Sequence, residues 1–362
     1  MPRTTASQPA RTHRSSRSAA KAVSVAAAVA LLATACGDDG GGDEQLETLN
    51  IDFATYNPLS LIILENGWLE EELEELDVDV KWVQSQGSNR ANENLRAGNI
   101  HVGSTAGSAA LLNRAVGADT HTIMVENQPE WSALVTQEGS DIESVEDLEG
   151  RSIAATLATD PYFFMARALQ EAGLSVDDVE VQALQHADGR QALENGDVDA
   201  WAGLDPIMAG AEAEGAELLY RNVEFNTYSV VNATGDFVEN HPDIAQIVVN
   251  VYEQAREWAT ENPEGTAEIL AEYAGIEPEI AEAVITERTN FDVDPVPGDD
   301  VYAAMEAAGP FFVENGDVDS QDAVDEALDS LFYTEFAENR EATDAEGTEN
   351  AADEADIEEA EE

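Results

Sequence analysis

Three segments place glycine and small hydroxyl side chains where a predicted strand turns into a predicted helix. They are residues 84–89 (QSQGSN), 103–108 (GSTAGS) and 156–162 (TLATDPY). Backbone N–H groups in the first turn of a helix lack an intrahelical acceptor, and the helix dipole makes that end positive. Glycine allows close approach, and serine and threonine add hydroxyl donors. Several such turns facing one cleft could bind a tetrahedral or planar oxyanion without lysine or arginine.

Helix capping explains each of these turns when it is taken singly. Ser88 and Asn89 are ordinary N-cap residues, and Asp160 before Pro161 is a common way to open a helix. An inward-facing Asp160 carboxylate would also oppose an anion at its own turn. Segment 103–108 lacks the three-glycine spacing of a dinucleotide-binding loop, which argues against that ligand.

The elements that must position these turns follow an alternating pattern, with short apolar runs between helical stretches. Strands alternating with helices predict mostly parallel sheets covered on both faces. Two such sheets predict two α/β lobes with a ligand cleft at the carboxyl ends of their strands. The expected strands are 49–53, 78–82, 100–102, 122–125, 132–136, 151–156, 179–183 and 198–202, and the expected helices are 59–75, 90–97, 109–115, 161–172, 189–195, 206–214, 244–260, 263–274, 277–286, 299–308 and 323–332.

The N-terminal residues have the pattern of an export signal. Residues 1–35 contain five cations and no acid, and an apolar run at 22–33 ends shortly before Cys36, the only cysteine. This run is too short to span a membrane, which takes about 20 apolar residues. The segment resembles the lipobox of bacterial lipoproteins, although Ala33 stands where that family usually has leucine. The resemblance implies that the Cys36 thiol is lipidated and anchors the protein to the outer face of the cell membrane.

The chain is long, acidic and almost free of lysine. It has 362 residues, 43% of them hydrophobic, and a formal net charge of -60. A nucleic acid is excluded as a partner because its binding requires a basic surface. Only Lys21 and Lys81 occur, which favours adaptation to high salt over a merely acidic composition. Concentrated salt screens the repulsion that such a charge creates.

These patterns divide the chain into six parts. The crossings between the lobes are expected near residues 126–128 and 222–228. The tail has almost no aliphatic side chain, and its composition predicts disorder. The parts are a signal peptide at 1–35, a flexible linker at 36–47, the first part of lobe 1 at 48–127, lobe 2 at 128–225, the return to lobe 1 with the C-terminal helices at 226–337, and an acidic tail at 338–362.

Several short motifs together resemble the periplasmic-type solute-binding proteins of ABC importers for aliphatic sulfonates, taurine and nitrate. Two positions depart from that family: Leu204 replaces a tryptophan before Asp-Pro, and 107–110 (GSAA) replaces Gly-Asp-Thr-Pro. The matching motifs are 87–91 (GSNRA), 103–108 (GSTAGS), 128–131 (QPEW), 145–150 (VEDLEG), 158–164 (ATDPYFF), 196–201 (GDVDAW) and 205–206 (DP).

The resemblance implies a two-lobed, hinged periplasmic-binding-protein fold of type II. It implies a monomer that delivers a small anionic solute to an ABC permease and its ATPase, with no cofactor and no metal. The resemblance also implies that the turns at Ser88, 105–108 and 159–162 border the ligand. Apart from the resemblance, aromatic side chains could supply apolar walls for an alkyl tail, with core packing an equal alternative for each of Tyr56, Trp131, Tyr162 and Trp201. Arg288 is a candidate cationic partner, although a solvated helix end is the favoured interpretation. The candidate ligand-binding residues are Tyr56, Asn57, Gly87, Ser88, Asn89, Thr105, Gly107, Ser108, Trp131, Thr159, Asp160, Tyr162, Trp201 and Asp205.

Other functions stay open at this point. An alkanesulfonate is the leading solute, and taurine, nitrate and a neutral pyrimidine or aromatic acid are the alternatives. An enzyme is disfavoured because the chain has no His-Glu-x-x-His helix and no Gly-x-Ser-x-Gly elbow. The cysteine-rich segment of the pyrimidine-synthase relatives is also missing. The histidines considered as catalytic groups are scattered along the sequence, at His101, His121, His186 and His241.

Overall fold

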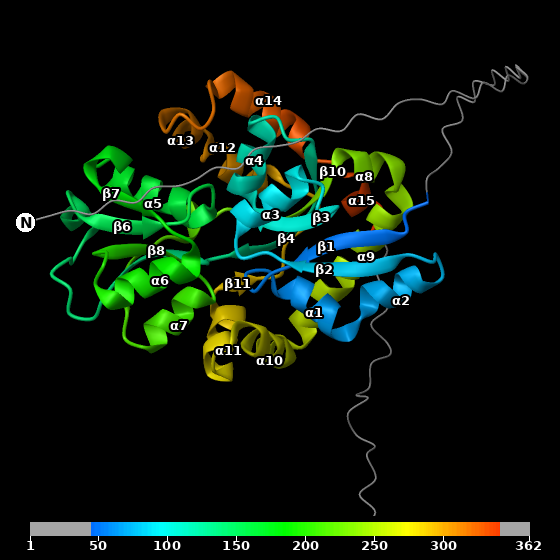
Figure 1. Cartoon of the computed structure of the whole chain (residues 1–362), viewed down its shortest axis with the longest axis horizontal. Helices are drawn as coiled ribbons and strands as arrows, with labels where there is room; N and C mark the ends of the chain where they lie inside the picture. The colour runs from blue at the N-terminus through cyan, green and yellow to red at the C-terminus, as the bar shows by residue number, and fades with distance from the viewer. Residues whose placement is uncertain (1–44, 341–362) are drawn as a thin grey trace, which may run out of the picture. The chain divides into compact units, whose positions relative to one another are not determined.

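The computed structural model describes residues 45–340. The expected signal peptide, Cys36, most of the linker and the acidic tail beyond Arg340 lie outside this range. Within it, the strands form one six-stranded and one five-stranded sheet, with helices on both faces of each (Figure 1). No helix between residues 45 and 340 combines the length and the apolar character needed to cross a membrane.

The first sheet has the strand order β11-β4-β10-β3-β1-β2. Strand β1 pairs in parallel with β2 and β3, whereas β10 runs antiparallel to both β3 and β4. Lys81 lies exposed on β2, at one edge of the sheet. The strands are β1 (Thr48–Phe53), β2 (Asp79–Gln84), β3 (Val102–Ala106), β4 (Thr120–Pro129), β10 (Ser229–Thr234) and β11 (Thr289–Asn290).

The second sheet has the strand order β7-β6-β8-β5-β9. Strand β6 pairs in parallel with β7 and β8, and β5 pairs antiparallel with β8 and β9. Both sheets therefore mix parallel and antiparallel neighbours, so the expectation of mostly parallel sheets is wrong. Strands β9, β10 and β11 were not expected from the sequence. The strands are β5 (Ser132–Thr136), β6 (Ser152–Ala155), β7 (Glu180–Ala183), β8 (Ala200–Leu204) and β9 (Glu217–Arg221).

The helices mostly follow the expected periodicity, but one expected helix is divided in two, and the short helices at 235–240, 309–314 and 335–338 were not expected. The single helix expected over 59–75 is two helices, because Gly67 adopts a left-handed φ of 67° and ends the first one. The helices are α1 (Pro58–Asn66), α2 (Trp68–Glu74), α3 (Ser88–Arg96), α4 (Gly107–Ala115), α5 (Asp160–Glu171), α6 (His186–Asn195), α7 (Ile207–Ala213), α8 (Gly235–Asn240), α9 (Pro242–Glu261), α10 (Pro263–Ala274), α11 (Pro278–Glu287), α12 (Asp299–Glu306), α13 (Gly309–Glu314), α14 (Gln321–Leu331) and α15 (Glu335–Glu338).

Alternate residues of a strand bury opposite faces of each sheet. In the second sheet, Ile153 packs in the cluster that holds α5, whereas the next residue, Ala154, packs in the cluster that holds α6. In the first sheet, Ile51 packs with residues of α1 and α9. The cluster around α5 also includes residues of α4 and of the C-terminal helices α12–α14. Elements of both sheets therefore share one apolar core.

The chain passes between the sheets twice. It leaves the first sheet at the end of β4 and enters β5 after only Glu130 and Trp131. The first crossing expected at 126–128 therefore lies inside β4, which continues to Pro129. The chain returns through residues 222–228, between β9 and β10, where the second crossing was expected. The proposed lobe boundaries at 127/128 and 225/226 stay predictions.

Candidate functional site

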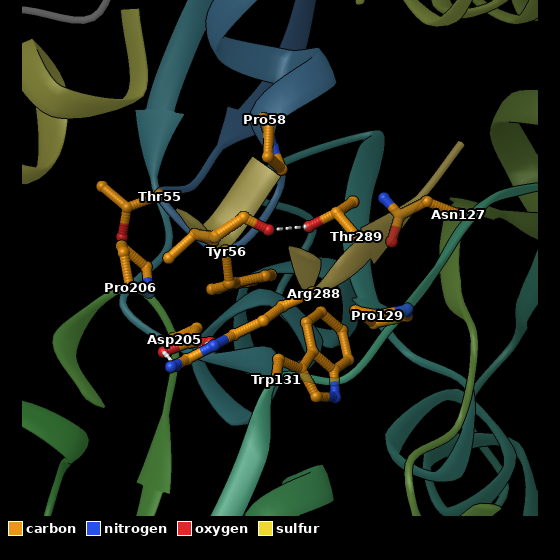
Figure 2. A pocket seen from close by; sticks show the side chains of 11 residues that line it. Thr55, Tyr56, Pro58, Asn127, Pro129, Trp131, Asp205, Pro206, Arg288 and Thr289 are labelled. Carbon is orange, nitrogen blue, oxygen red and sulfur yellow. Dashed lines mark hydrogen bonds and ion pairs between the residues drawn. The ribbon is translucent and has the colours of Figure 1, made fainter. Parts of the chain in front are cut away.

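A small cavity lies among the loops that follow the strands of both sheets. Its core has a volume of about 20 Å³, room for one or two water molecules. A larger solute can enter only after these loops move apart. Figure 2 shows its lining residues, which are Thr55, Tyr56, Pro58, Asn127, Pro129, Trp131, Asp205, Pro206, Val284, Arg288 and Thr289.

Tyr56 and Trp131 form the aromatic wall of this cavity. Their rings meet edge to face, with centroids 6.2 Å apart and an interplanar angle of 80°. The Tyr56 hydroxyl donates a hydrogen bond to the Ser104 carbonyl at 3.0 Å, which fixes the ring. Leu204 of β8 joins the same buried cluster as Ala54, Ala106 and Ala109. Apolar residues from both sheets therefore meet at this point.

Arg288 is buried beside the cavity and is not a solvated helix end. Its side chain is only 9% exposed, and its Nη1 atom lies 3.1 Å from Oδ2 of Asp205. A second guanidinium nitrogen donates to Glu212. Burial raises the pKa of Asp205 to about 6, although the neighbouring Arg288 charge acts in the opposite direction. Figure 2 shows the contact between Arg288 and Asp205. Because Glu212 engages the same guanidinium, Arg288 is not available as a free cation for a bound anion.

Asp160 occupies the place between the starts of α4 and α5 that was considered for an anion. Its Oδ1 accepts hydrogen bonds from the Ser108 hydroxyl at 2.6 Å and the Thr227 hydroxyl at 2.7 Å. Its Oδ2 accepts from the Trp131 indole and from the Thr227 amide, both at 2.8 Å. The protein's own carboxylate therefore uses these donors, and Thr227, which was not among the candidate residues, is one of them.

Several other candidate residues have internal partners. Asn57 caps α1 through a bond from the Ser60 amide at 3.2 Å. The Thr159 hydroxyl donates to the Thr156 carbonyl at 2.6 Å. The Thr105 hydroxyl accepts a bond from Asn232 at 2.9 Å. These side chains stabilise the loops that form the site.

The start of α4 is also closed by packing. The Gly107 amide donates to the Tyr228 carbonyl at 2.8 Å. A Cβ atom at Gly107 would lie 2.5 Å from Cε of Met305. The absence of a side chain here therefore makes room for α12. Ser88, at the start of α3, accepts a bond from the Ala106 amide at 3.0 Å through its hydroxyl.

Two aromatic candidates belong to other environments. Trp201 is completely buried in the core between the second sheet and α6, with Leu193 and Met208. Tyr162 packs in the core beside Phe163 and borders a separate groove with Phe311. Neither lines the cavity described above.

A further group, around Gly87, includes Gln185, which the sequence did not single out, and His186, which was considered only among the scattered histidines. Gln185 is the N-cap of α6 and His186 is its first residue, so they occupy another strand-to-helix turn. A Cβ atom at Gly87 would lie 2.8 Å from Oδ1 of Asn89 and 3.1 Å from Nε2 of His186. His186 is 1% exposed, and burial lowers its pKa to about 3. The only sequence signal was the position of these residues after a predicted strand, because residues 184–186 (LQH) have none of the glycine, serine or threonine that marked the three chosen turns.

Two buried carboxyl groups lie in the first sheet below these loops. Asp52 of β1 and Glu126 of β4 are both completely buried. The Asp52 carboxylate accepts a bond from the Ser104 amide at 2.9 Å, and Glu126 accepts one from the Ser229 hydroxyl at 2.5 Å. Burial raises the pKa of Asp52 to about 7 and that of Glu126 to about 8. Residues 45–340 contain no group of three or more His, Cys, Asp or Glu side chains placed to hold a metal ion.

Comparison with protein families identifies the chain's relatives. Residues 61–266, which are more than half of the sequence, match the family model described as NMT1/THI5 like. The chain belongs to the NMT1/THI5-like family. A Bacillus subtilis (strain 168) relative, named "putative aliphatic sulfonates-binding protein", is 26% identical over 88% of this chain and 97% of its own length. An Escherichia coli (strain K12) protein of the same name is 28% identical over 65% of this chain and 75% of its own.

Solved structures show which fold this NMT1/THI5-like chain has. The alkanesulfonate-binding protein SsuA from Xanthomonas axonopodis pv. citri, bound to MOPS, has a TM-score of 0.71, with 23% identity over 78% of this chain and 98% of its own. The periplasmic aliphatic sulphonate binding protein SsuA from Escherichia coli has a TM-score of 0.68, with 23% identity, and covers 85% of this chain and 98% of its own. The predicted α/β periplasmic-binding-protein fold is confirmed.

The same fold also serves an enzyme. The desulfurization enzyme DszB has a TM-score of 0.60, with 17% identity over 81% of this chain and 98% of its own. Fold likeness alone therefore does not separate binding from catalysis in this NMT1/THI5-like protein.

Proposed function

We propose that this chain is the extracytoplasmic solute-binding component of an ABC importer and captures an aliphatic sulfonate. The observation that carries the proposal is the convergence of loops from both sheets on the cavity beside Tyr56 and Trp131. Two relatives named for aliphatic sulfonate binding support the choice of solute. A monomer would deliver the solute to a permease driven by an ATPase.

The proposed mechanism is closure of the two sheets around the solute. Glu130 and Trp131 form one connection between the sheets, and residues 222–228 form the other. A solute that contacts loops of both sheets stabilises the closed form, because only that form offers both sets of contacts. The apolar wall formed by Tyr56, Trp131 and Leu204 suits an alkyl tail.

The head group must be recognised at short range. A chain with a formal net charge of -60 repels anions at a distance, and Arg288 is already paired with Asp205 and Glu212. Neutral donors and helix N-termini in a site that excludes water are then the groups that can hold a sulfonate.

Binding without catalysis is the proposed activity. The named relatives are binding proteins, and residues 45–340 contain no cysteine that could serve as a nucleophile. The proposal includes no cofactor and no metal. Export, lipidation of Cys36 and attachment to the outer face of the membrane are part of the same proposal, and the N-terminal pattern supports them.

Calorimetric titration of the processed protein with a matched solute panel tests the function. Butanesulfonate should bind, butyrate tests the head group, and sulfate tests the need for a tail. Taurine, nitrate and uracil represent the alternatives. At a solute concentration of 100 Kd the native state gains about 2.7 kcal/mol, so its Tm should also rise. If nitrate or uracil binds and no sulfonate does, the proposed solute is wrong and the solute that binds takes its place.

Adaptation to high salt is a separate part of the proposal. Surface repulsion should fall as NaCl rises, because the Debye length shrinks from about 10 Å at 0.1 M to about 3 Å at 1 M. The Tm should therefore increase over this range. If calorimetry shows that the Tm stays constant or falls over this range, the acidic composition is not an adaptation to high salt.

A further inference from the structure

Asn127, near the end of β4, has a buried side-chain donor that no other residue uses. The residue is 1% exposed, and its Nδ2 atom has no hydrogen-bond partner among residues 45–340. Asn127 also lines the cavity beside Tyr56 and Trp131. In Figure 2 its amide end is turned toward the other lining residues. An unpaired buried donor costs free energy, so one in the wall of a cavity points to a ligand that accepts from it.

Asn127 directly follows a β-bulge. Val125 of β4 pairs with Val230 of β10. The neighbouring residue of β10, Ser229, pairs with Asn127, so Glu126 is an extra residue on β4. The regular alternation of side chains between the two faces of the sheet is therefore broken at this point. Bulges are common beside active sites, where they redirect a side chain.

The other side-chain donors around the cavity are engaged or reach solvent. Tyr56, Trp131 and Arg288 have the partners described above. The Thr289 hydroxyl donates to a backbone carbonyl at 2.9 Å, and Thr55 is partly exposed and therefore accessible to water. Among the lining residues, the amide on β4 is therefore the buried side-chain donor that is free for a solute.

The opposite side of the cavity carries excess negative charge. Asp205 and Glu212 share the single guanidinium of Arg288 there, so two carboxylates face one cation. Figure 2 shows Asp205 and Asn127 on opposite sides, with the aromatic wall between them. An anionic head group is therefore repelled from the Asp205 side, and the neutral donor lies where this repulsion is weaker.

We propose that the sulfonate head of the solute accepts a hydrogen bond from the Asn127 side-chain amide, while its alkyl tail lies along Tyr56 and Trp131. This inference rests on the proposed function and names a residue that selects the head group. A charged acceptor strengthens such a bond, so affinity does not require a free cation. The present volume of about 20 Å³ is too small for the head group, so the bond forms after the loops have parted to admit the solute.

Calorimetry on matched variants tests this contact. Asn127→Leu removes the donor at similar size, and the affinity for butanesulfonate should fall about 10- to 100-fold, as for a hydrogen bond to a charged group. The Tm without solute should stay the same or rise, because an unpaired buried polar atom is removed. Asn315→Leu is the control, because Asn315 also has an unpaired buried Nδ2 atom but lies at the end of α13, beside a separate groove. This control should bind butanesulfonate as tightly as the wild type.

NMR of the isotope-labelled wild type provides a second readout if Asn127→Leu folds poorly. The side-chain NH2 signals of Asn127 should shift when butanesulfonate is added, and those of Asn315 should not. If butanesulfonate binds but the Asn127 signals do not move, or if Asn127→Leu binds it as tightly as the wild type, the head-group position is wrong and the function stands. If no sulfonate binds to the wild type, both the function and this inference are wrong.

Discussion

The Ser108 hydroxyl donates a 2.6 Å hydrogen bond to Asp160, joining the first turn of α4 beside the first sheet to the first turn of α5 beside the second. Trp131 and Thr227, which lie in the two crossings between the sheets, donate to the same carboxylate. The buried Asp160 therefore links the starts of α4 and α5 to each other and to both crossings between the sheets. Any separation of the sheets must lengthen or replace these bonds.

Asp160→Asn should destabilise the protein by about 2–4 kcal/mol, because bonds to a charged acceptor are lost and a buried donor is left unpaired. The free energy of unfolding in urea is the measurement. Asp188→Asn is a matched control, since Asp188 is also an acid in a first helical turn but is exposed. Its effect should stay within about 0.5 kcal/mol, apart from the small helix-dipole contribution. Equal losses in the two variants would show that Asp160 contributes no more than a helix-end charge.

The buried pair Asp52 and Glu126 should make the folded state less stable as the pH rises. Both pKa values are raised on folding, so the folded state binds these protons more tightly than the unfolded state. Their stabilising contribution is complete below about pH 4, the region of the ordinary unfolded pKa values, and is lost as the pH passes 7 and then 8.

The double variant Asp52→Asn, Glu126→Gln isolates this effect from the rest of the acidic chain. Its free energy of unfolding should fall less than that of the wild type between pH 4 and pH 8, because neither side chain can ionise. Denaturant unfolding at several pH values gives both curves. Parallel curves for wild type and variant would contradict the raised pKa values.

Arg288→Gln should cost about 3–5 kcal/mol, because it leaves the buried Asp205 carboxylate without its cation. Asp205→Asn should cost less, since Arg288 keeps its pairing with Glu212. In urea unfolding, the free energy of unfolding should therefore fall more for Arg288→Gln than for Asp205→Asn. The reverse order would mean that Asp205 stabilises the fold mainly through another contact, such as the bond it accepts from the Ala209 amide, and not through Arg288.

Gly107→Ala should destabilise the protein by about 1–3 kcal/mol through overpacking against Met305. Met305→Leu shortens the opposing side chain and should recover part of that loss in the double variant. A double-mutant cycle on the free energy of unfolding measures the coupling. Additive effects would indicate that the loss arises at another contact, such as the Tyr228 carbonyl, which would lie 3.4 Å from the added Cβ.

The sequence predicted the two sheets because β1, β2, β6 and β7 each read as short apolar runs followed by helical patterns. It did not predict β10, whose residues SVVNAT carry little alternation, or its antiparallel pairing with β3 and β4. That pairing follows from where the second crossing returns the chain. Local periodicity carries no information about this long-range choice.

The candidate site shows the same limit. Tyr56, Trp131 and Asp205 lie around one cavity, as residues that follow strands of facing sheets should. Asp160 was recognised as a helix opener, but a turn pattern does not say whether its carboxylate caps its own helix or reaches across to Ser108. His186 was considered only as one of several scattered histidines, because it lies just before the helix expected at 189–195 and the sequence does not show which groups the fold brings next to it.

Lys81 has a practical consequence for following the protein's motion. It is the only lysine between residues 45 and 340, and it lies exposed on the outermost strand of the first sheet. An amine-reactive dye would therefore mark this region at a single known position. An acceptor dye could be attached to a single cysteine introduced on the second sheet. Energy transfer between the two dyes would then report opening and closing, and no other lysine in this region would carry the donor dye.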